Sequence, residues 1–281
     1  MAIACSEKCI FDWVIGKLRH SFVSLTIHYL RKSIPMSRPT VLITGGSKRI
    51  GKATAIAFAS RGCNIALHYN HSRQSAERVQ EEISHNFSVT CTIHQGELNN
   101  YQPATEKLIS ECLSQHGRLD YLINNASIFY PTPMREAKPA QLDSFLKVNC
   151  LAAKHLAELA WPSLQKAQGA IVNLIDIYAD AGLAEHTLYT ASKACLKSLT
   201  QELALVMAPW IRVNGVSPGA ILWPEQQSHV GEEQLKILAS TSLKKLGTAE
   251  AIAETVVFLA MRAHYITGSV INVDGGRRDF I

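Results

Sequence analysis

Tyr189 and Lys193 lie four positions apart in a stretch with helical spacing, residues 189–207. Side chains at this spacing face the same side of a helix. A tyrosine with its ordinary pKa of about 10 is a poor acid or base at neutral pH, but a nearby ammonium lowers that pKa and makes proton transfer practicable. The acid Asp176 precedes Tyr189 by thirteen residues and follows an apolar run. These three side chains form a candidate proton-transfer site; the alternative for the pair alone is a surface tyrosine beside a solvated lysine.

A second pattern follows the first apolar run, where residues 44–51 read TGGSKRIG. Gly45 permits a tight turn and Gly51 permits close contact at the start of a helix that we expect to begin at Ile50, so backbone N–H groups there can bind a pyrophosphate. Lys48 and Arg49 lie in the same turn, where the positive end of the helix repels cations unless an anion is present. A plain strand-to-helix turn would explain the glycines alone, and the two cations favour a dinucleotide cradle.

The second predicted strand ends without an acid that could bind a ribose hydroxyl. Its end is instead polar or basic, with His68, Tyr69, Asn70, His71, Ser72 and Arg73. Such donors and cations favour the 2′-phosphate of NADP over the free ribose of NAD. Taken singly, His71 or Arg73 would be an ordinary surface residue, so the preference depends on the missing acid. A cationic nicotinamide bound nearby would also lower the pKa of Tyr189.

Apolar runs that alternate with helical patterns predict the fold that brings these residues together. Seven runs are expected to be strands, at residues 40–44, 63–69, 89–93, 119–124, 170–175, 211–216 and 270–273. The alternation predicts an α/β domain, a doubly wound and mostly parallel sheet with helices on both faces. Ligands of such sheets bind beyond the carboxyl ends of the strands. The Gly45 turn, residues 124–127, Asp176 and residues 217–219 all follow predicted strands.

The charge of the chain is concentrated at its beginning. Of the net +5 carried by 281 residues, residues 1–40 contribute +4, so the remainder is nearly neutral. A basic surface for nucleic acid would require a cluster of cations, and we expect no nucleic-acid partner. The seven cysteines are odd in number and widely spaced, with no metal-binding pattern, which favours a reducing compartment, the cytoplasm, and no metal.

Residues 1–36 differ in character from the rest. Their longest uncharged stretch, residues 20–30, is shorter than the roughly 20 apolar residues of a membrane helix, so we expect no membrane partner. We interpret this segment as an N-terminal extension, disordered or preceding a true start at Met36, and residues 37–281 as one NADP-binding domain. A basic presequence or a signal peptide is the alternative.

Together, the motifs resemble those of the short-chain dehydrogenase/reductase family over residues 38–278. The resemblance implies a single Rossmann-type domain that transfers hydride from NADP(H) to a small molecule and assembles as a homotetramer. It implies that Tyr189 transfers a proton, Lys193 orients the ribose and Asn149 completes a proton relay. The remaining cofactor contacts that we expect come from Glu97, Leu98, Asn125, Ala126, Ser127, Pro218 and Gly219. Glu97 stands where the family commonly has an aspartate, which leaves the adenine contact open.

Two residues depart from the general family pattern, and together with a third they resemble the pteridine reductases. Arg49 replaces a glycine of the turn, Asp176 replaces a serine, and Phe129 matches an aromatic residue that stacks a pterin ring against the nicotinamide. The resemblance implies that Arg49 and Ser127 bind both cofactor and substrate. Reduction of a C=N bond needs a proton on nitrogen, which an acid supplies better than a serine. A turn-capping Asp176 and a packing Phe129 are the alternatives.

The sequence therefore favours an NADPH-dependent reductase of pterins such as dihydrobiopterin, with folates as further substrates. Two alternatives stay open. One is a carbonyl reductase of the same family, acting on an oxoacyl compound or a sugar, and the other is a non-catalytic NADP-binding regulator. Asp176, Arg49 and Phe129 disfavour the first, while Tyr189 and Lys193 disfavour the second.

Overall fold

The computed structural model describes residues 38–221 and 232–277. The compact unit that contains them spans Arg38–Ile281. Residues 1–36, which we interpreted as an extension, and residues 222–231, between β6 and the next helix, lie outside the described residues. The domain boundary at residue 37 stays a prediction.

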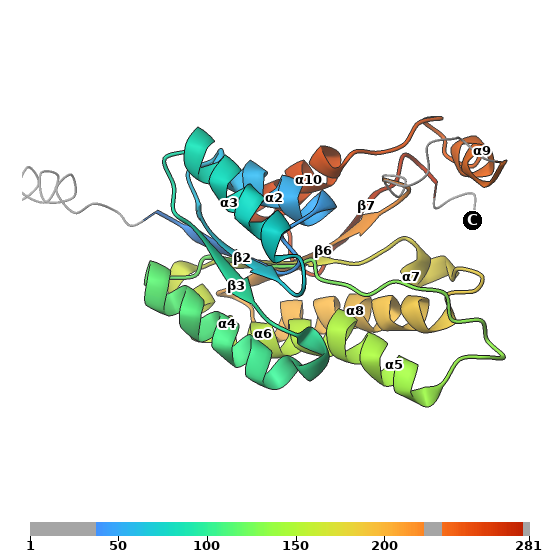
Figure 1. Ribbon diagram of the computed structural model, residues 1–281, viewed down its shortest axis with the longest axis horizontal. Helices are drawn as coiled ribbons and strands as arrows, with labels where there is room; N and C mark the ends of the chain where they lie inside the picture. Colours follow the sequence, from blue (N-terminus) through green and yellow to red (C-terminus); the bar gives the residue numbers. More distant parts are fainter. Residues whose placement is uncertain (1–37, 222–231, 278–281) are drawn as a thin grey trace, which may run out of the picture. The chain divides into compact units, whose positions relative to one another are not determined.

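Seven parallel strands form one sheet in the order β3-β2-β1-β4-β5-β6-β7 (Figure 1). The order reverses beside β1, because the chain builds β2 and β3 on one side of it and β4 to β7 on the other. This arrangement confirms the predicted doubly wound parallel sheet. The strands are β1 (Thr40–Ile43), β2 (Asn64–Tyr69), β3 (Cys91–Gln95), β4 (Tyr121–Asn124), β5 (Ala170–Leu174), β6 (Arg212–Pro218) and β7 (Val270–Val273).

Helices cover both faces of the sheet (Figure 1). One layer holds α2 (Arg49–Ala59), α3 (Arg73–Asn86) and α10 (Ala249–Met261), and the other holds α4 (Tyr101–His116), α6 (Ala152–Ala167) and α8 (Thr187–Val206). Side chains alternate between the layers along each strand. In β1, Val41 and Ile43 pack into the core under the first layer and Leu42 into the core under the second. Both faces are therefore apolar, as expected of a parallel sheet between two helical layers.

Shorter elements lie near the carboxyl edge of the sheet. They are η1 (Leu98–Asn100), α5 (Pro139–Leu146), the π-helix η2 (Lys147–Leu151), α7 (Tyr178–Ala181) and α9 (Glu232–Ala239). Because all strands are parallel, their carboxyl ends share this edge, and the predicted motifs meet there. Within the described ranges, no helix is long and apolar enough to cross a bilayer.

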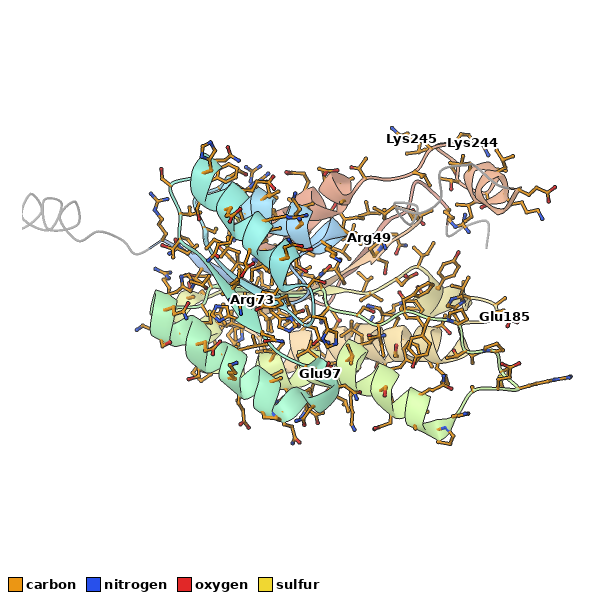
Figure 2. The ribbon with its side chains drawn as sticks, in the orientation of Figure 1. Arg49, Arg73, Glu97, Glu185, Lys244 and Lys245 are labelled. Atoms are coloured by element: carbon orange, nitrogen blue, oxygen red, sulfur yellow. The ribbon has the colours of Figure 1, made fainter. Side chains whose placement is uncertain are left out.

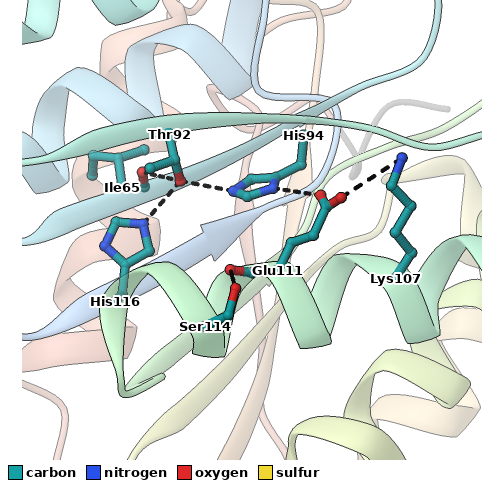
Figure 3. Close-up of polar contacts among 7 residues, drawn as sticks. All are labelled: Ile65, Thr92, His94, Lys107, Glu111, Ser114 and His116. Carbon is teal, nitrogen blue, oxygen red and sulfur yellow. Dashed lines mark hydrogen bonds and ion pairs between the residues drawn. The ribbon is translucent and has the colours of Figure 1, made fainter.

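The third strand differs from the prediction. It runs over Cys91–Gln95 and not over residues 89–93, because β3 pairs with β2 as far as Gln95 opposite Tyr69. The strand continues through the buried His94, whose Nδ1 contacts Glu111 Oε2 at 2.9 Å and whose Nε2 contacts Thr92 Oγ1 at 2.7 Å (Figure 3). A buried polar group is tolerated where it is hydrogen-bonded. The apolar run alone therefore misplaced the strand.

Candidate active site

The turn after β1 is fixed by its neighbours and has no room for side chains at its glycines. A Cβ on Gly51 would meet the Gly45 carbonyl oxygen at 2.2 Å and Asn125 Nδ2 at 2.7 Å. The Asn125 side chain donates to the carbonyls of Thr44 and Gly45 at 2.9 and 3.0 Å, and the backbone N–H of Ala126 donates to Thr44 Oγ1 at 3.0 Å. Loops after β1 and β4 are thus joined, and the closely packed turn fits a pyrophosphate cradle.

Arg49 has a backbone conformation that usually belongs to glycine. Its φ is +48°, in the left-handed region, and it is the first residue of α2. Lys48 precedes it in an extended conformation as the N-cap. The side chain of Arg49 is exposed at the carboxyl edge of the sheet (Figure 2). A non-glycine residue in this region stores backbone strain, and such strain concentrates at binding sites.

We expect Arg49→Gly to separate stability from binding. Glycine relieves the left-handed strain at the cost of a more flexible unfolded chain, so the free energy of unfolding should rise by roughly 0.5–1 kcal/mol. Loss of the cation should weaken NADPH binding roughly tenfold. Thermal melts and fluorescence titration measure the two effects. Gln168→Gly, at another left-handed position with φ +50°, is the control: it should stabilise similarly and leave NADPH affinity unchanged.

His68 positions the turn and does not provide a charge. Its Nδ1 accepts from the Gly45 N–H at 3.1 Å, so the proton is on Nε2, which donates to the Gly96 carbonyl at 3.0 Å. Burial lowers the pKa of this histidine to about 4. This corrects the argument that counted His68 among the cations for a 2′-phosphate. Tyr69 and Leu98 are also buried, each in a hydrophobic core, and a contact of either residue with the cofactor stays a prediction.

The pairing of β2 with β3 brings an acid beside the end of β2. Glu97 Oε2 accepts from Asn70 Nδ2 at 2.7 Å and lies 3.6 Å from His71 Nε2. The hydrogen bond from the Asn99 N–H lowers the pKa of Glu97, and the hydrogen bond from the Asn70 side chain lowers it further. These bonds outweigh the partial burial of the carboxylate, which raises the pKa. The sequence analysis inferred a preference for NADP because β2 ends without an acid. That inference is incomplete, because Glu97, which follows β3, brings a carboxylate to the same region.

The positive side of this region comes from the start of α3. Ser72 is the N-cap of α3, and Arg73 follows it (Figure 2). Arg73 is exposed and pairs with Glu77 at 2.8 Å. An exposed pair at this spacing contributes only a few tenths of a kcal/mol, so the guanidinium can exchange this partner for a phosphate.

Asp176 and Tyr189 form the hydrogen bond at the centre of the site. The Tyr189 hydroxyl donates to Asp176 Oδ2 at 2.7 Å, and the Tyr178 N–H donates to Oδ1 at 3.0 Å. Burial raises the pKa of both side chains, and the Asp176 carboxylate raises that of Tyr189 further, well above its ordinary value. The described residues therefore keep Tyr189 protonated, whereas the sequence led us to expect a lowered pKa. In this state Tyr189 carries the proton that the predicted proton transfer requires.

Lys193 lies beneath this pair, on the next turn of α8. The residue is 3% exposed, its Nζ donates to the Leu174 carbonyl at 2.8 Å, and Nζ lies 5.9 Å from the centre of the Tyr189 ring. Burial lowers the pKa of the ammonium to about 8. Lys193 and Tyr189 face the same side of the helix, as their spacing predicted.

Asn149 occupies the π-helix η2, a rare conformation that is frequent at functional sites. Its Oδ1 accepts from the Ile128 N–H at 2.8 Å, and its Nδ2 donates to Ser192 Oγ at 2.9 Å and to the Ile128 carbonyl at 3.2 Å. The side chain thus joins the loop after β4 to α8, immediately before Lys193. Its contacts position both segments, and the proposed relay through Asn149 stays a prediction.

Phe129 and His186 form an aromatic wall beside Tyr189. Phe129 is 57% exposed and stacks on His186 with ring centres 4.5 Å apart and planes 12° apart. Its ring is nearly perpendicular to that of Tyr189, at 4.7 Å. The sequence did not reveal His186; its place just before α8, three residues from Tyr189, is the available signal. Ser127, two residues before Phe129, is exposed.

The end of β6 closes the other side. The Pro218 carbonyl accepts from the Ile177 N–H at 3.4 Å, and a Cβ on Gly219 would meet Asp274 Cα at 2.6 Å. These contacts join the end of β6 to the segment after β5 on one side and to the residue that follows β7 on the other. Across the described residues, no group of His, Cys, Asp or Glu could hold a metal ion.

The fold and these contacts define a dinucleotide-binding α/β protein with a buried, hydrogen-bonded tyrosine and carboxylate at the carboxyl edge of its sheet. A family model described as Enoyl-(Acyl carrier protein) reductase matches residues 45–278. The chain therefore belongs to this family of short-chain dehydrogenases/reductases and is an NAD(P)-dependent oxidoreductase.

Several known proteins are similar to this chain. It is 32% identical over 244 residues to the 3-oxoacyl-(acyl-carrier-protein) reductase FabG of Staphylococcus epidermidis, covering 84% of this chain and 98% of that protein. It is 29% identical over 277 residues to pteridine reductase 1 of Leishmania tarentolae, covering 85% and 96%. A solved structure, a blue fluorescent protein from a metagenomic library in complex with NADPH, matches with a TM-score of 0.79 at 29% identity, covering 85% of this chain and 97% of that chain.

Proposed function

We propose that the protein reduces dihydropterins with NADPH. The observation that carries this proposal is the 2.7 Å hydrogen bond from the Tyr189 hydroxyl to the Asp176 carboxylate. It couples an acid to the proton donor where the general family has a serine. Bound NADPH supplies the hydride to the carbon of the C=N bond.

The chain's own residues then handle the proton. Tyr189 remains protonated beside Asp176, and a buried carboxyl with a raised pKa can both accept from a pterin amino group and pass a proton to ring nitrogen. The Lys193 ammonium stabilises the negative charge that develops when Tyr189 donates. Asn149 holds the segments that carry Phe129 and Lys193 in place.

The cofactor proposal rests on the turn after β1. Its close-packed glycines, Lys48 and Arg49 suit the pyrophosphate, and NADP(H) is the cofactor. We propose that His71, Ser72 and Arg73 bind the 2′-phosphate while Lys193 orients the nicotinamide ribose. The carboxylate of Glu97, which lies beside His71, offsets part of the positive charge there. Because the remaining attraction between cations and phosphate is screened by salt, NADPH binding should weaken as the salt concentration rises.

Phe129 is proposed to stack on the substrate ring. Replacing it with alanine should raise the KM for dihydrobiopterin several-fold with a smaller change in kcat, because a stacking contact contributes on the order of 1 kcal/mol. Steady-state kinetics measures both constants. Met134→Ala is the control, since Met134 lies in the same segment and is 79% exposed; it should change neither.

A carbonyl reductase is the second candidate, favoured by the similarity to the 3-oxoacyl reductase. A carbonyl needs a neutral donor to its oxygen, and the Tyr189 hydroxyl is one. Asp176 disfavours this candidate, because a carboxylate beside the developing oxyanion opposes its charge. For a non-catalytic regulator, the paired Tyr189 and Asp176 would have no use.

Oxidation of NADPH in the presence of candidate substrates tests the function. We expect dihydrobiopterin and dihydrofolate to support it and a panel of ketones, sugars and oxoacyl thioesters to support little. Oxidation with the oxoacyl compounds alone would favour the second candidate. We further propose a cytoplasmic homotetramer, with α6 and α8 at the interface, built from residues 37–281.

A further inference from the structure

Arg277 is a buried cation with only neutral partners among the described residues. The residue is 7% exposed. Its Nη1 donates to the Ile237 carbonyl at 3.0 Å and to Ser240 Oγ at 2.9 Å, and its Nη2 donates to the Tyr178 hydroxyl at 2.9 Å. Across residues 38–221 and 232–277, no carboxylate oxygen lies within 4.0 Å of the guanidinium. A buried charge is costly unless an anion compensates it.

The end of α9 compensates only part of this charge. Ile237 lies in the last turn of that helix and Ser240 follows it, where the helix carries about half a negative charge. Arg212 shows a fuller compensation, because it donates to three carbonyls at the end of α10 and is only half buried. Arg277 has one carbonyl partner and is buried more deeply. Three of its five N–H groups have acceptors among the described residues, and the other two have none there.

The position of Arg277 connects it to the active site. The end of β7 lies between α9 and α7 (Figure 1), and Arg277 bonds to both helices. Its partner Tyr178 donates its own N–H to Asp176, the acceptor of the Tyr189 hydroxyl. Arg277 is thus linked to Asp176 through a single residue, Tyr178, and its other helix, α9, belongs to the connection between β6 and α10.

The surroundings of α9 are basic. Lys244 and Lys245 follow the helix (Figure 2), and Lys236 lies within it. Lys244 Nζ donates to the Ala239 carbonyl at 2.6 Å. None of the three lysines has an ion-pair partner within the described part of the chain. Because α9 also begins with Glu232 and Glu233, the three lysines leave a small excess of positive charge on this side, which attracts anions.

We propose that Arg277 anchors an oxyanion subsite of the substrate pocket, which binds a carboxylate or phosphate on the substrate's tail while the ring lies at Asp176 and Tyr189. The subsite rests on the proposed function for the ring that it accompanies. The two N–H groups of Arg277 that have no acceptor among the described residues, together with its full positive charge, suit an oxyanion. A neutral-tailed substrate would leave the buried guanidinium uncompensated.

Kinetics with matched substrates tests the subsite. Dihydrobiopterin has a neutral tail, dihydrofolate a tail with carboxylates, and dihydroneopterin monophosphate a tail with phosphate. Arg277→Met should raise the KM of an anionic substrate roughly tenfold and that of dihydrobiopterin less than twofold, with kcat kept. Arg277→Lys should recover part of the loss. The substrate whose KM responds identifies the oxyanion. Arg212→Met, a cation bonded to a helix end elsewhere, should change no KM ratio.

A second measurement needs no turnover. With NADPH saturating, malonate or inorganic phosphate should raise the Tm of the wild type more than that of Arg277→Met. Equal Tm shifts, or equal KM changes for all three compounds, would overturn the subsite and leave Arg277 as a support for α9. A wild type that reduces none of the compounds but shows the anion-dependent shift contradicts the proposed function and leaves the subsite standing.

Discussion

Tyr189→Phe should lose roughly 10²-fold or more in kcat while it binds NADPH with unchanged affinity. The substitution removes the hydroxyl that donates to Asp176 and leaves the packed ring and the glycine turn in place. Single-turnover kinetics and fluorescence titration measure the two quantities. Turnover close to that of the wild type would mean that Asp176 or water delivers the proton without the tyrosine.

The residual activity of this variant should depend on pH in a defined direction. The hydrogen bond from Tyr189 lowers the pKa of Asp176, while burial raises it by a larger amount. Without the hydroxyl the pKa of Asp176 should rise further, so its acid form persists to higher pH. Residual pterin reduction should therefore be greatest at low pH and fall as pH rises through that raised pKa. A residual rate that increases with pH would exclude Asp176 as the donor.

Asp176→Ser should impair pterin reduction selectively, by roughly 10²-fold in kcat/KM, because a serine hydroxyl is a weak acid for a ring nitrogen. Fold and NADPH affinity should be retained, since the Asp176 side chain accepts hydrogen bonds only from the Tyr189 hydroxyl and the Tyr178 N–H among the described residues. Removing the carboxylate should also lower the pKa of Tyr189. Asp176→Asn keeps the shape and is the matched variant: it should be equally impaired. Unchanged pterin kinetics in both would make Asp176 a turn residue.

The sequence predicted the sheet and the edge at which the site forms. Strands such as β1 are buried on both faces, so their continuous apolar runs can be recognised in the sequence without knowledge of the neighbouring strands. Gly51 and the spacing of Tyr189 and Lys193 are local patterns, and their placement required only the order of the elements. The polar end of β3 could not be predicted from the sequence, because His94 is hydrogen-bonded to Glu111 of α4, a contact that only the folded structure shows.

Roles that depend on pairing between distant segments could not be predicted. His68 is polar at a strand end, and only the packing of Gly45 and Gly96 around it shows that it is a neutral support. Glu97 reaches Asn70 because β2 and β3 are neighbours. The raised pKa of Tyr189 follows from its burial beside Asp176, which spacing along the chain does not express.

A competition between two substrates tests the central claim most directly. Wild-type enzyme receives NADPH deuterated at the transferred position, together with equal concentrations of dihydrobiopterin and an oxoacyl thioester, and mass spectrometry measures where the deuterium appears. Because the ratio of products reports the ratio of kcat/KM values, no separate rate is needed. The Asp176–Tyr189 pair predicts that the label enters the pterin in large excess. Label that enters the hydroxyacyl product, with an unlabelled pterin, would contradict the pterin assignment and establish the protein as a carbonyl reductase.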